Sequence, residues 1–339
     1  MPTILCSVAT RGRYFTTLPM VLSSIINQTR KVDKLVIFDD NDEPKDMREE
    51  PMYQALFWQM AAKGIDWEWL FAEKKGQHHI HQRANLMGYD WVWRVDDDAV
   101  PESNVLENLS KHIADGVGAI AGSVLNPPRM PEVLPSTGKL ENIEIEPNIQ
   151  WGLIDKVKEV EHLHCTFLYR AGVMDFNTGL SRVAHREETL FTYGLHQKGY
   201  KILAVPNAVT WHMKNPQGGI RSETNAAMYE HDEAIFKNSL IYKDHTIVVL
   251  NNGLGDHIVF SKVLPKIKNP IVFTCYPEVV EGLSIAEAEH RFGSLDQWNI
   301  YKKMADWNWK GSLEDAFRVA LAMPIEDFQL DYLEMRHIP

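Results

Sequence analysis

Hydrophobic and polar positions alternate along the first hundred residues in short blocks that predict strands and helices in turn. Four short apolar runs predict strands at Thr3–Val8, Lys34–Phe38, Trp67–Phe71 and Trp91–Val95. Apolar residues at helical spacing lie between them, at Leu18–Asn27, Pro51–Lys63 and Gln82–Gly88. Strands that alternate with helices are typical of an α/β fold with a mostly parallel sheet, which binds ligands at the carboxyl ends of its strands.

The remainder of the chain predicts further elements of this fold, a linker helix and a small second unit. Residues 126–150 are rich in Pro, Glu and Asn and predict an irregular excursion. Beyond it the pattern predicts strands in Val157–Tyr169, Ile202–Val205 and Val209–Met213, and helices at Glu187–Lys198 and Glu223–Leu240. We therefore expect a domain at 1–225, a linker helix at 226–242, and a small Rossmann-like accessory domain at 243–339 with strands at Thr246–Leu250 and Ile271–Cys275.

Two clusters of acidic residues come directly after predicted strands. Asp39-Asp40 follows the second strand, and Asp96-Asp97-Asp98 follows the fourth. Adjacent carboxylates repel one another, and residues 99–101 after the triplet supply no cation. Mg²⁺ or Mn²⁺ prefers carboxylate oxygens and also binds phosphates, so two such clusters at one sheet edge favour a nucleotide with its metal ion. The triplet alone is equally consistent with a solvated acidic turn that caps the next helix.

Several short motifs follow one another along the chain between residues 3 and 222. They are Thr10 after the first strand, Asp39-Asp40 after the second, Arg83-Ala84-Asn85 before the acidic triplet, and the triplet itself. A later signature consists of His185-Arg186-Glu187-Glu188-Thr189, Gly199, Pro206 and Trp211-His212. In this order and spacing the motifs resemble those of the family 2 glycosyltransferases of the GT-A fold.

The resemblance implies a binding site for a nucleotide-sugar donor, with UDP favoured. The residues that it assigns to the nucleotide are Thr10, Arg11, Asp39, Asp40, Arg83, Asp96 and Asp97. Either carboxylate of the 39–40 pair would accept a hydrogen bond from the base. Uracil N3–H suits this role, although guanine also offers donors. The resemblance further implies that Asp98 and His212 hold Mn²⁺ or Mg²⁺ at the diphosphate.

The resemblance also implies an inverting transfer to a hydroxyl group of a glycan or another acceptor. Glu188 would be the general base, although the family usually has Asp at this position. Glu187 and Trp151 would lie on the acceptor side, and Lys214 and Arg221 would belong to a lid over the diphosphate. The two glutamates are also simply consistent with acidic residues that complement a helix dipole, and 214–222 with a flexible connector.

The composition of the chain indicates which kinds of binding partner and which cellular compartment to expect. The chain has 339 residues, of which 45% are hydrophobic and 24% are charged, as in ordinary globular proteins. Its net charge of −11 disfavours nucleic-acid binding without excluding it. No apolar run is long enough to span a membrane, and the N-terminal residues predict a strand and not a signal peptide. Three widely spaced cysteines imply no disulfide framework, so we expect a cytoplasmic protein.

Other readings of these motifs stay open at this point. A sugar nucleotidyltransferase would share the sheet and metal, but would be expected to carry a glycine-rich loop where this chain has Thr10-Arg11-Gly12-Arg13. A catalytically inactive sugar-binding or scaffold module is the other alternative. Two groups, His78, His79 and His81, and His162, His164 and Cys165, lack a recognised zinc-ligand spacing. The Asn-Gly-Leu-Gly-Asp turn at 252–256 resembles the opening of family 9 (heptosyltransferase-like) GT-B enzymes.

Overall fold

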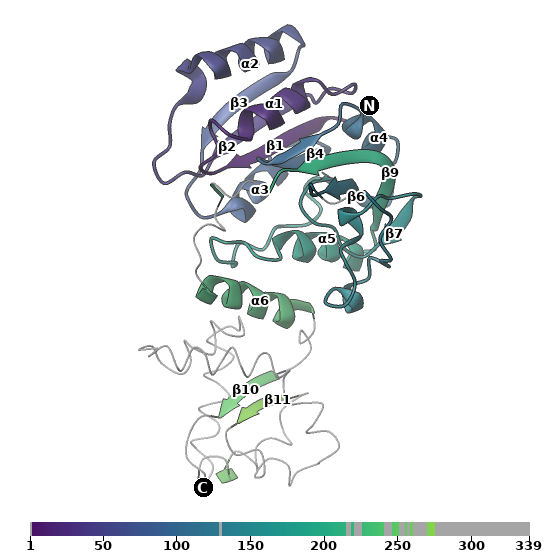
Figure 1. The fold of residues 1–339 in the computed structure, drawn as a ribbon. Helices are drawn as coiled ribbons and strands as arrows, with labels where there is room; N and C mark the ends of the chain where they lie inside the picture. Colours follow the sequence, from purple (N-terminus) through teal and green to yellow (C-terminus); the bar gives the residue numbers. More distant parts are fainter. Residues whose placement is uncertain are drawn as a thin grey trace. The chain divides into compact units, whose positions relative to one another are not determined.

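The computed structural model describes residues 2–128, 131–214, 218–219, 226–240, 246–250, 255, 258–259 and 270–274. The chain divides into two compact units, Met1–Thr224 and Asn225–Pro339. Each unit is considered by itself below (Figure 1).

A nine-stranded mixed sheet forms the centre of the first unit, in the order β3-β2-β1-β4-β8-β6-β9-β5, with β7 paired to β9 (Figure 1). Its strands are β1 (Ile4–Thr10), β2 (Lys34–Asp39), β3 (Asp66–Phe71), β4 (Trp91–Asp96), β5 (Ala99–Pro101), β6 (Val117–Leu125), β7 (Lys158–Val160), β8 (Phe167–Arg170) and β9 (Lys201–His212). Parallel pairing joins β3, β2, β1 and β4, and also β6 and β9. The other pairs, β4–β8, β6–β8, β5–β9 and β7–β9, are antiparallel. The α/β class is confirmed, but parallel pairing predominates only in the N-terminal half.

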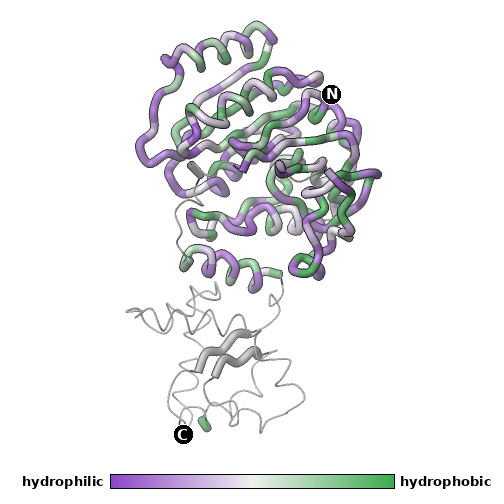
Figure 2. The backbone as a smooth tube through the Cα atoms, viewed as in Figure 1, coloured by the Kyte–Doolittle hydropathy of each residue, from purple (hydrophilic) through white to green (hydrophobic). Residues whose placement is uncertain are grey.

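Helices cover both faces of this sheet. They are α1 (Leu18–Ile26), α2 (Pro51–Ala62), α3 (Gln77–Asn85), α4 (Val105–Ser110) and α5 (Glu187–Gln197), with single 3-10 turns η1 (Met47–Glu49), η2 (Leu140–Asn142) and η3 (Ile149–Trp151). Alternate residues of β1 belong to two separate hydrophobic clusters, one with α1, α2 and α4 and the other with α3 and α5. Hydrophobic stretches accordingly lie along the central strands (Figure 2).

The boundaries differ from the sequence prediction in three places. Helix α3 begins at Gln77, before the predicted start at Gln82. The predicted strand region Val157–Tyr169 contains β7 and β8, separated by irregular residues 161–166. The strands predicted on either side of Pro206 are one continuous strand, β9. Its pairing with β6 changes register between Ala121 and Ser123, opposite this proline, and a bulge is where a strand tolerates a residue without an N–H.

The second unit is described only in part. Helix α6 (Ala226–Leu240) occupies the predicted linker position, and β10 (Thr246–Leu250) pairs in parallel with β11 (Pro270–Thr274). Cys275 and most of the glycine-containing turn lie outside the described residues. In the described part of the chain, no helix has both the length and the apolar character needed to cross a membrane.

Candidate active site

The carboxyl ends of β1, β2 and β4 meet at one edge of the sheet. Thr10 is paired with Asp39 across β1 and β2, and Ala9 is paired with Asp96 across β1 and β4. Both acidic clusters therefore lie at the same edge, as the sequence predicted. This edge is where parallel α/β sheets bind their ligands.

Asp97 is held by the loop that follows β1. The Thr10 hydroxyl donates to Asp97 Oδ2 at 2.8 Å, and the Arg11 N–H donates to the same oxygen at 3.2 Å. The Arg13 guanidinium pairs with Asp97 and also contacts Asp98 Oδ2 at 3.0 Å. Burial nevertheless raises the pKa of Asp97 to about 6. The triplet thus receives a cation from a distant loop, although the residues directly after it supply none.

His212 lies beside the last carboxylate of the triplet. Antiparallel pairing places His212 opposite Ala99, and its Nε2 lies 3.3 Å from Asp98 Oδ1. The other ring nitrogen, Nδ1, is 2.8 Å from Asn126 Oδ1. Asn126 and Asp98 therefore hold the imidazole from its two nitrogens.

Two potential metal ligands, a carboxylate and an imidazole, meet in this pair. Among the residues that the structure describes, no group of three or more His, Cys, Asp or Glu side chains is arranged to hold a metal. Neither histidine group considered for zinc therefore forms such a site there. Mg²⁺-like ions are commonly held by one or two carboxylates together with substrate phosphates. Asp98 and His212 fit an ion that is completed by a diphosphate, and they do not fit an all-protein metal site.

The carboxylates of Asp39 and Asp40 have different surroundings. Asp39 accepts hydrogen bonds from the Tyr14 hydroxyl and from the Asn41 side-chain amide at 2.7 Å. Asp40 is buried, and its Oδ1 has no hydrogen-bond partner. Burial raises the pKa of Asp40, while Arg182 and Arg11 oppose this rise. The Asp39 carboxylate therefore stabilises the fold. The Asp40 carboxylate receives backbone hydrogen bonds from Lys74 and Gly76, but its Oδ1 accepts none from the residues that the structure describes.

The two arginines assigned to the nucleotide occupy different places. Arg11 donates to the backbone oxygen of Asp40 at 2.9 Å and forms an ion pair with Asp42, which Arg182 also contacts at 2.6 Å. Arg83 is exposed on α3, and its guanidinium carbon lies 5.6 Å from the centre of the Phe38 ring. Arg11 therefore borders the acidic edge directly, whereas Arg83 lies over the strand that leads to it.

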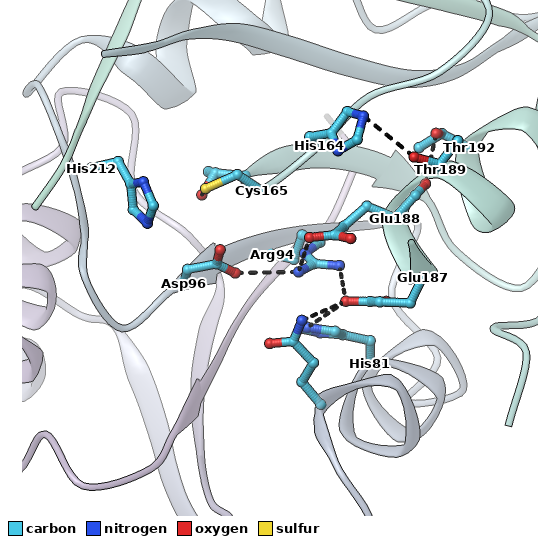
Figure 3. A network of polar contacts seen from close by, with 12 residues as sticks. His81, Arg94, Asp96, His164, Cys165, Glu187, Glu188, Thr189, Thr192 and His212 are labelled. Atoms are coloured by element: carbon cyan, nitrogen blue, oxygen red, sulfur yellow. Dashed lines mark hydrogen bonds and ion pairs between the residues drawn. The ribbon is translucent and has the colours of Figure 1, made fainter. Parts of the chain in front are cut away.

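Buried charges link this edge to the start of α5 (Figure 3). Arg94 is fully buried on β4, and its Nη1 donates to Glu187 Oε1 at 2.7 Å. Its Nη2 lies 3.2 Å from Asp96 Oδ1 and 3.7 Å from Glu188 Oε1. Gln77 Nε2 also donates to Glu187 Oε1, at 2.9 Å. Arg94 and Gln77 thus both donate to Oε1 of Glu187. The Glu188 carboxylate contacts Arg94 only at the longer distance of 3.7 Å.

Two of the remaining predicted residues, Trp151 and Lys214, lie outside this network. Trp151 ends η3 and is 48% exposed. Lys214 is exposed two residues after β9, and Arg221 lies outside the described residues. Cys165 has a left-handed backbone with φ of 57°, and burial raises the pKa of its thiol, which disfavours the thiolate that a metal requires.

Sequence reasoning did not identify Arg13, Arg94 and Asn126. Arg94 carried a usable signal, because it is the only charged residue between Trp91 and Val95 in a strand predicted to be buried. Arg13 and Asn126 carried none, since their partners are distant in the sequence.

Comparison with known proteins identifies the fold. No family model matches the sequence, and no match is found among curated proteins. Among solved structures, GalNAc-T7 with UDP, GalNAc and Mn²⁺ has a TM-score of 0.51 at 13% identity, covering 72% of this chain and 49% of its own. S. aureus TarS 1-349 in complex with UDP-GlcNAc has a TM-score of 0.52 at 13% identity, covering 98% of this chain and 91% of its own. The chain has a glycosyltransferase fold. It spans about half of the GalNAc-T7 chain.

Proposed function

We propose that the protein is a nucleotide-sugar glycosyltransferase that moves a sugar from a UDP-type donor to a hydroxyl acceptor. The observation that carries this proposal is the approach of His212 Nε2 to Asp98 Oδ1, 3.3 Å, at the edge where β1, β2 and β4 end. The fold supports it, because GalNAc-T7 has been solved with UDP and Mn²⁺ and TarS with UDP-GlcNAc.

The nucleotide is proposed to bind between the loop after β1 and the acidic edge. Asp40 Oδ1, buried and without a hydrogen-bond partner, would accept the N3–H of uracil. Asp97 is occupied by Thr10 and Arg13, whereas the Asp96 side chain is 21% exposed and is the better candidate for a ribose hydroxyl. Arg11 and Arg83 border this region.

Asp98 and His212 would hold Mn²⁺ or Mg²⁺ together with the donor diphosphate. The ion, when bound, supplies positive charge that stabilises the departing diphosphate. Asn126 contacts Nδ1 of His212 and orients the ring so that Nε2 faces Asp98 and the ion. Lys214 and Arg221 are proposed to meet the diphosphate from the other side.

Glu188 is the proposed general base. It lies in the first turn of α5, and its side chain retains 9% exposure, whereas Glu187 is enclosed by Arg94 and Gln77. A carboxylate that removes the acceptor proton during attack on the anomeric carbon fits a single displacement with inversion. Glu187 then serves the fold, and Trp151 is proposed to lie on the acceptor side. Residues 243–339 are proposed, separately, to form an accessory domain that binds an acceptor, a partner or nothing.

A donor screen with nucleotide-release detection tests the proposal. Wild type, Asp98→Ala and the exposed-site control Asp115→Ala would be measured with Mn²⁺ and with EDTA, alongside calorimetry with UDP. We expect metal-dependent UDP binding and release in wild type and control, and loss of release in Asp98→Ala. Absence of metal-dependent UDP binding in wild type would contradict the proposal. UDP binding without hydrolysis or transfer would favour an inactive sugar-binding module, and transfer of a nucleotidyl group would favour a nucleotidyltransferase.

A further inference from the structure

Arg94 occupies an unusual position for a charged residue. It lies in the middle of β4, with no exposed surface, and its guanidinium carbon is 5.2 Å from the centre of the Phe167 ring. A guanidinium stays protonated in proteins, so a full positive charge is buried here. Such a charge is costly unless carboxylates compensate it with good geometry.

Three carboxylates from two parts of the chain meet this single cation. The groups that face Arg94 are Asp96 on its own strand, Glu187 and Glu188 on α5, His81 and Gln77 on α3 through Glu187, and Phe167 and Tyr169 on β8. Burial lowers the pKa of His81, and nearby Arg94 lowers it further, so this imidazole is neutral. Burial also raises the pKa of Glu187, which Arg94 opposes.

The two nitrogens of the guanidinium have different partners. Nη1 is fixed by Glu187, which is itself fixed by Gln77. The other nitrogen, Nη2, faces both Asp96 and Glu188, at 3.2 Å and 3.7 Å (Figure 3). Arg94 Nη2 therefore contacts a carboxylate at the acidic edge, Asp96, and a carboxylate at the start of α5, Glu188. Glu187 orients the guanidinium, and the guanidinium orients the other two carboxylates.

We propose that Arg94 is a positioning residue that holds the Glu188 carboxylate in register with Asp96, with Glu187 as its anchor. This inference rests on the proposed function, in which Asp96 meets the donor and Glu188 meets the acceptor hydroxyl. Because the rate of a displacement depends steeply on how base, acceptor and donor are aligned, loss of this link lowers kcat more than it weakens donor binding.

A purely structural role makes a different prediction. Replacement of a buried ion pair by apolar side chains of similar volume is often neutral or stabilising, whereas removal of one partner is strongly destabilising. Arg94→Met alone leaves Glu187 without its cation and is expected to lower the melting temperature. The double variant Arg94→Met with Glu187→Leu removes both charges and is expected to recover much of that loss.

The double variant, Arg94→Lys and wild type separate the two roles. Arg170→Met serves as a matched control, because this arginine stacks on Trp91 from β8 and contacts none of the acidic residues of the site. Measurements are melting temperature, UDP affinity by calorimetry, and kcat and KM against pH in the donor-release assay. In the double variant we expect UDP affinity within about threefold of wild type and kcat lower by about 10²-fold.

In Arg94→Lys we expect partial retention of kcat, since one ammonium group retains the charge but not the fork of donors. A folded double variant with wild-type kcat would overturn the positioning role while leaving the proposed function intact. Wild type that neither binds UDP nor releases it from any donor would overturn the proposed function, and the positioning role with it.

Discussion

His212 Nε2 lies 3.3 Å from Asp98 Oδ1, which joins the end of β9 to the turn after β4. The contact is built by the sheet, because the antiparallel pairing of β5 with β9 sets His212 opposite Ala99. The Met213 N–H also donates to the backbone oxygen of Asp98 at 2.8 Å. Backbone contacts at His212 and at Met213 therefore hold the His212 and Asp98 side chains close together without a ligand.

Asn126 is expected to control metal affinity through His212. Its Oδ1 lies 2.8 Å from Nδ1 of the imidazole and orients the ring so that Nε2 faces Asp98. Replacement of such an orienting group typically costs 10- to 100-fold in metal affinity, so we expect Asn126→Ala to weaken Mn²⁺ binding in the presence of UDP by about that range. Mn²⁺ titration followed by electron paramagnetic resonance measures it. UDP affinity in EDTA is the control, and an unchanged Mn²⁺ affinity would contradict the assignment.

Asp97 is expected to make the stability of the protein depend on pH. Burial raises its pKa from 3.8 to about 6, so the folded state binds more protons than the unfolded state between these values. The contribution of Asp97 to stability is therefore most favourable below pH 4, falls as the pH rises to about 6, and stays lower above it. The shift corresponds to about 3 kcal/mol.

Asp97→Asn mimics the neutral carboxyl group and tests this sign. In EDTA, the variant is expected to be more stable than wild type at pH 7.5 and to lose that advantage at pH 4. Urea unfolding at the two pH values measures the difference. Equal stability differences at both pH values would show that the Arg13 ion pair, and not burial, dominates the energetics of this carboxylate.

Asp39 and Asp40 are expected to separate stability from nucleotide recognition. Asp39 accepts from Tyr14 and Asn41, so Asp39→Ala leaves buried donors unpaired and is expected to cost about 1–3 kcal/mol of stability. Asp40 Oδ1 accepts no hydrogen bond from the described residues, so Asp40→Asn is expected to lower stability less than Asp39→Ala and to weaken UDP binding about tenfold. Thermal melts and calorimetry with UDP provide the two readouts. Wild-type UDP affinity in Asp40→Asn would remove this carboxylate from base recognition.

The acidic edge was predictable from the sequence, whereas the groups that complete it were not. Asp39 and Asp96 end apolar strands, and the parallel order of β2, β1 and β4 brings such ends together. Arg13 contacts Asp97 and Asp98 only because the loop after β1 turns back over β4. A contact between residues so far apart in the sequence leaves no local pattern from which it could be predicted.

The strand that carries His212 shows the same limit. Pro206 marked a break between two predicted strands, yet the structure continues through it as β9 because the pairing with β6 shifts register there. A mixed, mostly parallel sheet was expected, and the sheet is mixed, but the sequence did not indicate which strands pair antiparallel. The direction of a strand depends on its connections and not on its hydrophobic pattern.

The close approach of two glycine loops is expected to matter for donor binding. The Gly219 N–H donates to Arg11 O at 2.7 Å, and a Cβ on Gly218, whose φ is +76°, would lie 2.7 Å from Gly12 O. Gly218→Ala therefore forces apart the loop that carries Arg11 and Arg13. We expect this displacement to lower UDP affinity about tenfold, which corresponds to about 1.4 kcal/mol.

Gly64→Ala is the matched control for this variant. Gly64 has a similar φ of +71°, but a Cβ there would meet no atom within 4 Å. Both variants carry the same left-handed backbone strain, and only Gly218→Ala adds the steric clash with the loop after β1. Calorimetry with UDP and Mn²⁺ should therefore show weaker binding in Gly218→Ala alone. Equal affinities in the two variants would mean that the packing of these loops makes no contribution to the donor site.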